Sequence, residues 1–289
     1  MTMASRSIAL MVGFVLVWTV TEAIIGSLLN AYSPLQIVWM HYLVQLVIWG
    51  LVVGVRAPKR LVRTGKLPFQ FLRAVMLLMM PLSWALARQQ GFGDTAYAAF
   101  WATPFLVILF TAILSKDRTP AFLWLAAIAG GLAAGLIFTQ PAIPHARALA
   151  GIIGMPVSFS LFIVLTRALK TEPTSANLFY LPLGIVACLM PFIPKVWMAP
   201  DLQHILFFML TGGMSLVALW MLDKAAKTAP LAPVAPLLLA PIPLTFLLNW
   251  LSTHQRPGIQ LLILLAIVCL ASIAPILLGL KALRKRLPS

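Results

Sequence analysis

The sequence predicts an all-α membrane protein with ten transmembrane helices. Of its 289 residues, 62% are hydrophobic and only 9% are charged, and the mean hydropathy is +1.00. Soluble domains average about 45–50% apolar and about 25% charged residues. A spanning helix needs ~20 mostly apolar residues, and ten such stretches fill almost the whole chain. No polar segment between them is long enough to fold separately, so we expect a single membrane domain over residues 1–289.

The ten stretches can be marked off in order along the chain. The expected spans are 8–28, 35–55, 69–87, 95–114, 121–139, 149–166, 176–194, 203–222, 231–251 and 259–281. The ninth begins within KTAPLAPVAPLLLAPIP, which carries five prolines. Neighbouring helices or water must satisfy the backbone groups that these prolines free. Nine or eleven spans are therefore alternatives to ten.

The basic residues predict an orientation. With ten spans, the N-terminus, the even-numbered connections and the C-terminus share one side of the membrane, and 17 of the 21 Lys and Arg residues fall there. The four on the other side are Arg88, Arg147, Lys195 and Arg256. The positive-inside rule then predicts a multi-pass membrane protein with both termini cytoplasmic. We attribute the excess charge to topology and to anionic membrane lipids, not to nucleic acid, because no basic face alternates with aromatics outside the bilayer.

Weak internal similarity divides the chain into residues 1–141 and 142–289. Pro104 is followed by an apolar run that ends in KDRTP at 116–120, and Pro241 by a run that ends in HQRP at 254–257. Five spans in each half would place two homologous halves in opposite orientations, as in many transporters. We therefore expect two inverted five-helix repeats.

These features together resemble the EamA-type transporters of the drug/metabolite transporter superfamily. The resemblance rests on the ten spans, the proline-containing fourth and ninth spans, and Asp117-Arg118 followed by AAIAGGLAAGLIF. At the second corner Gln255-Arg256 lacks the acid, so that match is the weaker one. Within the superfamily the chain looks most similar to bacterial aromatic amino acid exporters. The resemblance implies a central cavity enclosed by eight helices, with the fifth and tenth spans at the periphery.

Two glycines of the fifth span allow two interpretations. Gly131 and Gly135 form a small-xxx-small pattern, which lets helix backbones approach closely. Packing within the chain is one interpretation, and a homodimer contact is the other.

Glu22 stands alone in the apolar stretch LVWTVTEAIIG. A charged side chain at the centre of a spanning helix costs about 2.5–3.5 kcal/mol on insertion scales, so intramembrane acids usually face the bundle interior or a watery cavity. We expect Glu22 to face a cavity and to bind or couple a solute. The alternative is a structural role, in which a protonated Glu22 bonds the hydroxyl of Thr19 or Thr21.

A rise of ~1.5 Å per residue places several polar and aromatic side chains at a depth similar to that of Glu22. They lie on the second, third and fourth expected spans, and they are His41, Trp84, Tyr97 and Trp101. Gln45 lies one turn from His41 and extends a polar stripe along the second span. No second metal-ligating side chain accompanies His41 at helical spacing, so we expect no metal. Ordinary packing is the alternative for His41 and Trp101.

Further candidates come from residues able to line a flexible or polar cavity. Methionine thioethers suit adaptable apolar surfaces, although core filling is equally compatible. We expect breaks in the sixth span at Pro156 and in the eighth at Gly212-Gly213, which would expose helix ends to a solute. The remaining candidate substrate-binding residues are Met80, Ser158, Tyr180 and Met214.

The sequence and the resemblance together imply an exporter of small organic metabolites, with amino acids, including aromatic ones, as the expected cargo. No Walker motif is present and no cofactor is implied. A multidrug or cationic-compound exporter of the same superfamily is the alternative. A membrane-embedded enzyme is less compatible with six scattered acids, because such chemistry uses paired acids or a nucleophile with a base. Whether a proton drives transport, and in which direction, stays open.

Overall fold

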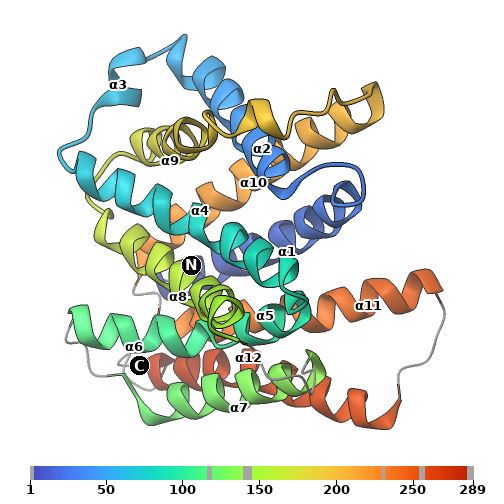
Figure 1. Ribbon diagram of the computed structural model, residues 1–289. Helices are drawn as coiled ribbons and strands as arrows, with labels where there is room; N and C mark the ends of the chain where they lie inside the picture. Colours follow the sequence, from blue (N-terminus) through green and yellow to red (C-terminus); the bar gives the residue numbers. More distant parts are fainter. Residues whose placement is uncertain (1–2, 116–118, 139–144, 230–231, 254–257, 285–289) are drawn as a thin grey trace.

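The computed structural model describes residues 3–115, 119–138, 145–229, 232–253 and 258–284. Every regular element in these ranges is a helix (Figure 1). Six helical segments are long and apolar enough to cross a membrane. They lie in α1 (Met3–Leu28), α2 (Pro34–Trp49) with its continuation η1 (Gly50–Gly54), α4 (Leu67–Gln89), α8 (Ala146–Ala168), α10 (Leu202–Thr228) and α12 (Ile259–Arg284). The prediction of an all-α, multi-pass membrane protein is confirmed at this level.

The other elements are shorter or bent. Helices α5 (Gly93–Phe100) and α6 (Thr103–Ser115) make a seventh span if the pair, bent by 50°, is counted as one. Shorter apolar helices are α7 (Ala121–Phe138), α9 (Thr174–Leu189) and the pair η3 (Ala232–Leu239) and α11 (Pro241–Thr253). The connections hold α3 (Pro58–Val62) and η2 (Ile193–Lys195). Each expected span overlaps a helix, but the count of ten stays a prediction because only six or seven meet the length of a span.

The breaks in the helices differ from those predicted. Helix α8 continues through Pro156, and α10 continues through Gly212 and Gly213. The break between α5 and α6 instead precedes Pro104, which has no N–H to offer the carbonyl of Phe100. The hydroxyl of Thr103 donates to that carbonyl in its place. The expected helix breaks at Pro156 and Gly212-Gly213 are therefore wrong.

Gly212 has a packing role. A Cβ atom added there would lie 2.6 Å from Cγ1 of Val44 and 3.0 Å from the carbonyl oxygen of His41. Only a residue without a side chain lets α10 come this close to α2. Gly212 therefore sets a helix crossing, and the glycine pair does not interrupt the helix.

The helices pack chiefly in three pairs. Helix α4 lies along α8, α1 along α10, and α7 along α12, the last pair at the bottom of Figure 1. Small residues mark the α4–α8 crossing, since a Cβ atom at Gly151 would lie 2.6 Å from the carbonyl oxygen of Ser83. Close backbone approach is thus the main packing device of this bundle.

The two glycines of α7 have different surroundings. A Cβ atom at Gly131 would meet the carbonyl oxygen of Trp101 at 3.1 Å, so Gly131 packs within the chain. Nothing lies within 4 Å of the corresponding position at Gly135. The expected corner Asp117-Arg118 and its counterpart Gln255-Arg256 lie outside the described residues.

We expect Gly151→Ala to weaken the α4–α8 crossing. The added methyl group has backbone atoms of Ser83 and Ala87 within 3 Å, and overpacking of this kind costs roughly 1–3 kcal/mol. The apparent melting temperature of the purified protein in detergent should fall. Gly135→Ala is the matched control and should leave it unchanged or raise it slightly, because alanine favours helix. Equal melting temperatures for the two variants would contradict this role for Gly151.

Candidate functional site

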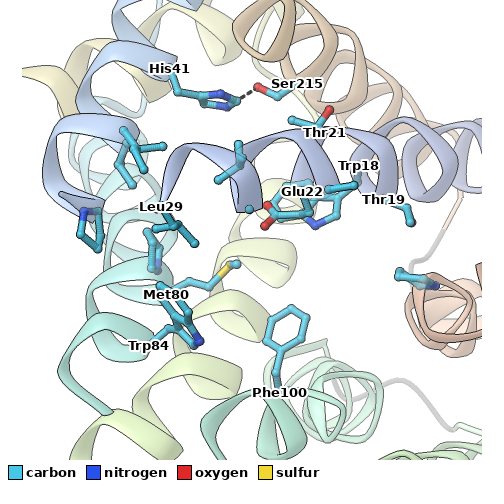
Figure 2. A pocket seen from close by; sticks show the side chains of 18 of the residues that line it. Trp18, Thr19, Thr21, Glu22, Leu29, His41, Met80, Trp84, Phe100 and Ser215 are labelled. Atoms are coloured by element: carbon cyan, nitrogen blue, oxygen red, sulfur yellow. Dashed lines mark hydrogen bonds between the residues drawn. The ribbon is translucent and has the colours of Figure 1, made fainter. Parts of the chain in front are cut away.

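A cavity of about 320 Å³ lies inside the bundle. Side chains of α1, α2, α4, α5, α8, α10 and α11 line it (Figure 2). Its wall is largely apolar and includes six aromatic rings, which belong to Trp18, Tyr42, Trp84, Tyr97, Phe100 and Trp101. Ligand cavities typically measure about 300–1,000 Å³ and combine apolar walls with a few polar groups. This cavity therefore has the size and character of a site for one small organic molecule.

Among the described residues that line the cavity, Glu22 is the only acid. Its side chain projects from α1 towards Met80, Trp84 and Phe100 in Figure 2, and it is accessible to solvent. Among the described residues, none gives its carboxylate a hydrogen bond or an ion pair. Tyr42 and Tyr97 lie near enough to interact with it electrostatically. The acid is therefore enclosed by the bundle and open to the cavity.

The neighbouring hydroxyls of α1 do not satisfy Glu22. Thr19 and Thr21 donate to the carbonyl oxygens of Val15 and Val17, each over 2.8 Å. Hydroxyls in apolar helices commonly bond back to the preceding turn in this way. The structural alternative, in which Glu22 bonds Thr19 or Thr21, is thus not the arrangement found.

A second polar group in the cavity wall joins α2 to α10. The Oγ atom of Ser215 lies 2.7 Å from Nε2 of His41, and both residues line the cavity. Behind them, Nε2 of the fully buried Gln45 donates to the same hydroxyl. The close approach at Gly212 brings Ser215 within reach of α2. The amide of Gln45 thus fixes the position of the Ser215 hydroxyl, which in turn is hydrogen-bonded to the imidazole of His41.

The structure gathers six of the ten predicted site residues around the cavity. These six are Glu22, His41, Met80, Trp84, Tyr97 and Trp101. Gln45 reaches it only through Ser215. Ser158 is buried in α8 and donates to the carbonyl of Met155, and Met214 is half-buried beside Ser215 without lining the cavity. Tyr180 lies at the end of the bundle, where its hydroxyl donates to the carbonyl of Val62 over 3.0 Å.

Several lining residues were not among the predicted ones. Trp18 is four residues before Glu22 on α1, so helical spacing alone places it on the same face. Phe100 is three residues after Tyr97 and shares its face in the same way. Ser215 carries no such signal, because it reaches the cavity only through the packing of α10 against α2. Trp84 also contacts a cation, since the guanidinium of Arg88 lies 5.1 Å from its ring centre.

The described part of the cavity wall offers a solute neither a lysine nor an arginine, nor a cluster of ligands for a metal ion. No Lys or Arg occurs among the described residues that line it. Within the described ranges, no three His, Cys, Asp or Glu residues come together as a metal site would require. A bound solute would therefore meet one carboxylate, one imidazole, several hydroxyls and the aromatic rings.

Comparison with known proteins identifies the fold and no more. No family model matches the chain, and no curated protein matches it. Twenty-eight chains of solved structures match. One of them, described as "Crystal structure of protein", aligns with a TM-score of 0.78 over 98% of this chain and 99% of its own, at 19% sequence identity. At that identity, the likeness shows a shared fold over the whole length of both chains.

The contrast between Glu22 and Asp223 can be tested chemically. We expect a hydrophobic carbodiimide to modify Glu22, which faces the cavity. It should spare Asp223 of α10, which is 1% exposed and accepts a hydrogen bond from Asn177. Mass spectrometry of the digested protein gives the readout. Glu22→Gln serves as the control and should lose the adduct. An unmodified Glu22 would show that reagents do not reach the cavity.

Proposed function

We propose that the chain is a membrane carrier that moves small organic solutes by alternating access through the central cavity. The observation that carries this proposal is the accessible carboxylate of Glu22, which has no bonding partner among the described residues and faces a largely apolar cavity with six aromatic rings. Intramembrane acids of this kind usually mark a substrate or ion pathway. A membrane-embedded enzyme fits less well, because Glu22 is the only acid that lines the cavity.

The helix packing supports ten spans in two inverted repeats as part of this proposal. If the halves are exchanged, α1 corresponds to α8, α2 to α9, and α4 to α10. The α4–α8 contact then becomes the α10–α1 contact, and the α2–α10 contact becomes the α9–α4 contact, and all four are present. The fourth unit of each half is also broken, as α5 and α6 in one and as η3 and α11 in the other. Two such halves can rock about a central site.

We propose amino acids, aromatic ones included, as the cargo. The carboxylate of Glu22 provides a partner for the ammonium group, and the rings of Trp84, Tyr97 and Phe100 provide surfaces on which an aromatic side chain can pack. We place the protein in the bacterial inner membrane with both termini cytoplasmic, on the distribution of its basic residues.

An exporter of organic cations is the second candidate, and one observation favours it. An amino acid also carries a carboxylate, but no Lys or Arg is among the described residues lining the cavity. A carboxylate surrounded by aromatic rings suits a cation, because the carboxylate and the faces of the rings both attract positive charge. The two candidates share the cavity and differ in whether the solute needs its own carboxylate.

Flux measurements should separate these candidates. Purified protein in liposomes should accelerate the movement of radiolabelled aromatic amino acids over protein-free liposomes. The corresponding decarboxylated amines form the matched panel. Faster flux of the amines alone would favour the organic-cation candidate, and no flux of any solute in either panel would contradict transport.

Glu22→Gln should abolish any dependence of flux on a pH gradient if the carboxylate carries the coupled proton, because an amide does not titrate. Flux driven by the solute gradient should persist at a reduced rate, since the amide keeps the shape of the side chain. Asp201→Asn is the control, because Asp201 caps α10 outside the cavity. An unchanged pH dependence in Glu22→Gln would leave Glu22 only a recognition role.

A further inference from the structure

A buried polar cluster lies beyond the cavity, between α4, α9 and α10. We call it the floor cluster, and it consists of Gln70, Arg73, Asn177, Asp223 and Lys227. Gln70 and Asn177 are 0% exposed, Asp223 is 1% exposed and Arg73 is 2% exposed. Two buried charges of opposite sign in a membrane-spanning bundle need a strong reason to be there.

Asn177 of α9 is the centre of the floor cluster. Its side-chain oxygen accepts from Nε2 of Gln70 over 2.6 Å, and its Nδ2 donates to Oδ1 of Asp223 over 2.6 Å. The guanidinium of Arg73 donates to its backbone carbonyl. One residue of α9 therefore ties α4 to α10.

Asp223 is held equally well on its other oxygen. Oδ2 accepts from the hydroxyl of Thr174 over 2.7 Å and lies 3.1 Å from Nζ of Lys227. Nζ of Lys227 also donates to the carbonyl of Glu172 over 2.7 Å, in the connection between α8 and α9. The carboxylate thus has three donors, in contrast to the unpaired Glu22.

The floor cluster directly underlies the cavity. Leu77 and Leu219 line the cavity, Arg73 precedes Leu77 by four residues on α4, and Asp223 follows Leu219 by four residues on α10. Four residues are about one helical turn, or ~6 Å. The two leucines and the floor cluster therefore form consecutive apolar and polar layers.

The side beyond these layers carries α3 and several basic residues, and we call it the basic end. These residues are Arg56, Lys59, Arg60, Arg63 and Lys66. At this end the carboxylate of Glu172 accepts from the hydroxyl of Thr64 over 2.7 Å and from the N–H of Gly65 over 3.0 Å, which joins the α8–α9 connection to the segment before α4. The cavity instead extends towards the α1–α2 turn, where Gly26, Leu29 and Pro34 line it.

We propose that the floor cluster is the closure between the cavity and the basic end, and that it must come apart before the cavity can open to that end. Apolar residues of similar volume often stabilise a bundle at least as well as a buried ion pair does. Charged and amide groups, however, can exchange their mutual bonds for water when the helices separate. A polar layer therefore suits a contact that has to open and close. This inference rests on the proposed carrier function.

Thiol accessibility tests the closure without measuring transport. Gly26→Cys is a suitable reporter, because Gly26 lines the cavity and nothing lies within 4 Å of the added Cβ atom. The background carries Cys188→Ala and Cys269→Ala, which remove both native thiols. A membrane-impermeant thiol reagent is added to either face of vesicles, and Lys59→Cys identifies the basic face.

With the floor cluster intact, the reporter should react from the face opposite the basic end. Asp223→Asn removes the anion that Lys227 and Thr174 bind, so labelling from the basic face should rise several-fold. Lys227→Gln should shift labelling in the same direction by a smaller amount and carries the test if Asp223→Asn does not fold. Glu22→Gln is the comparison, since it removes an acid that is not part of the closure.

The outcomes distinguish this inference from the proposed function. If folded Asp223→Asn or Lys227→Gln is labelled from the basic face no faster than the protein with the intact floor cluster, the closure is overturned, even where the protein transports solutes. A several-fold rise in a protein that moves no solute supports the closure and contradicts the carrier function. A rise of the same size in Glu22→Gln also overturns the assignment, because the effect would then follow from any lost charge.

Discussion

A charged or polar group inside a membrane-spanning bundle must find its partners within the protein or face water, and this constraint organises the whole structure. Asp223 satisfies it with three donors from α9 and α10. Glu22 satisfies it in the second way, by projecting into an accessible cavity. A carboxylate is thus bonded within the protein at Asp223 and faces the cavity at Glu22.

Close helix packing makes both arrangements possible. Gly212 brings α10 against α2, which puts Ser215 beside His41 at the cavity wall. A similar approach at Gly184, where a Cβ atom would lie 2.7 Å from Cβ of Ala74, holds α9 against α4 near the floor cluster. In lipid, where apolar surfaces gain little by associating, such small residues and the polar bonds between helices are what fix the bundle.

The sequence predicted which face of a helix a side chain occupies better than it predicted where a helix breaks, since α8 and α10 continue through Pro156 and Gly212-Gly213. The inward-facing Glu22 followed from the cost of a lipid-exposed charge, and Trp18 shares its face through helical spacing. The depths of His41, Trp84, Tyr97 and Trp101 were estimated well enough to collect them around one cavity. Tyr180, a candidate named without an estimate of depth, does not line the cavity, and its hydroxyl donates to the carbonyl of Val62.

The apolar composition alone determined that the chain is helical and crosses a membrane several times, because a lipid-exposed backbone must satisfy its hydrogen bonds within each segment. Tertiary structure decided which side chains meet. The bond between Gln45 and Ser215 joins positions 170 residues apart, and that between Gln70 and Asn177 joins positions 107 apart. No local pattern encodes such pairs, because they arise only when the crossing of two helices sets their distance and rotation.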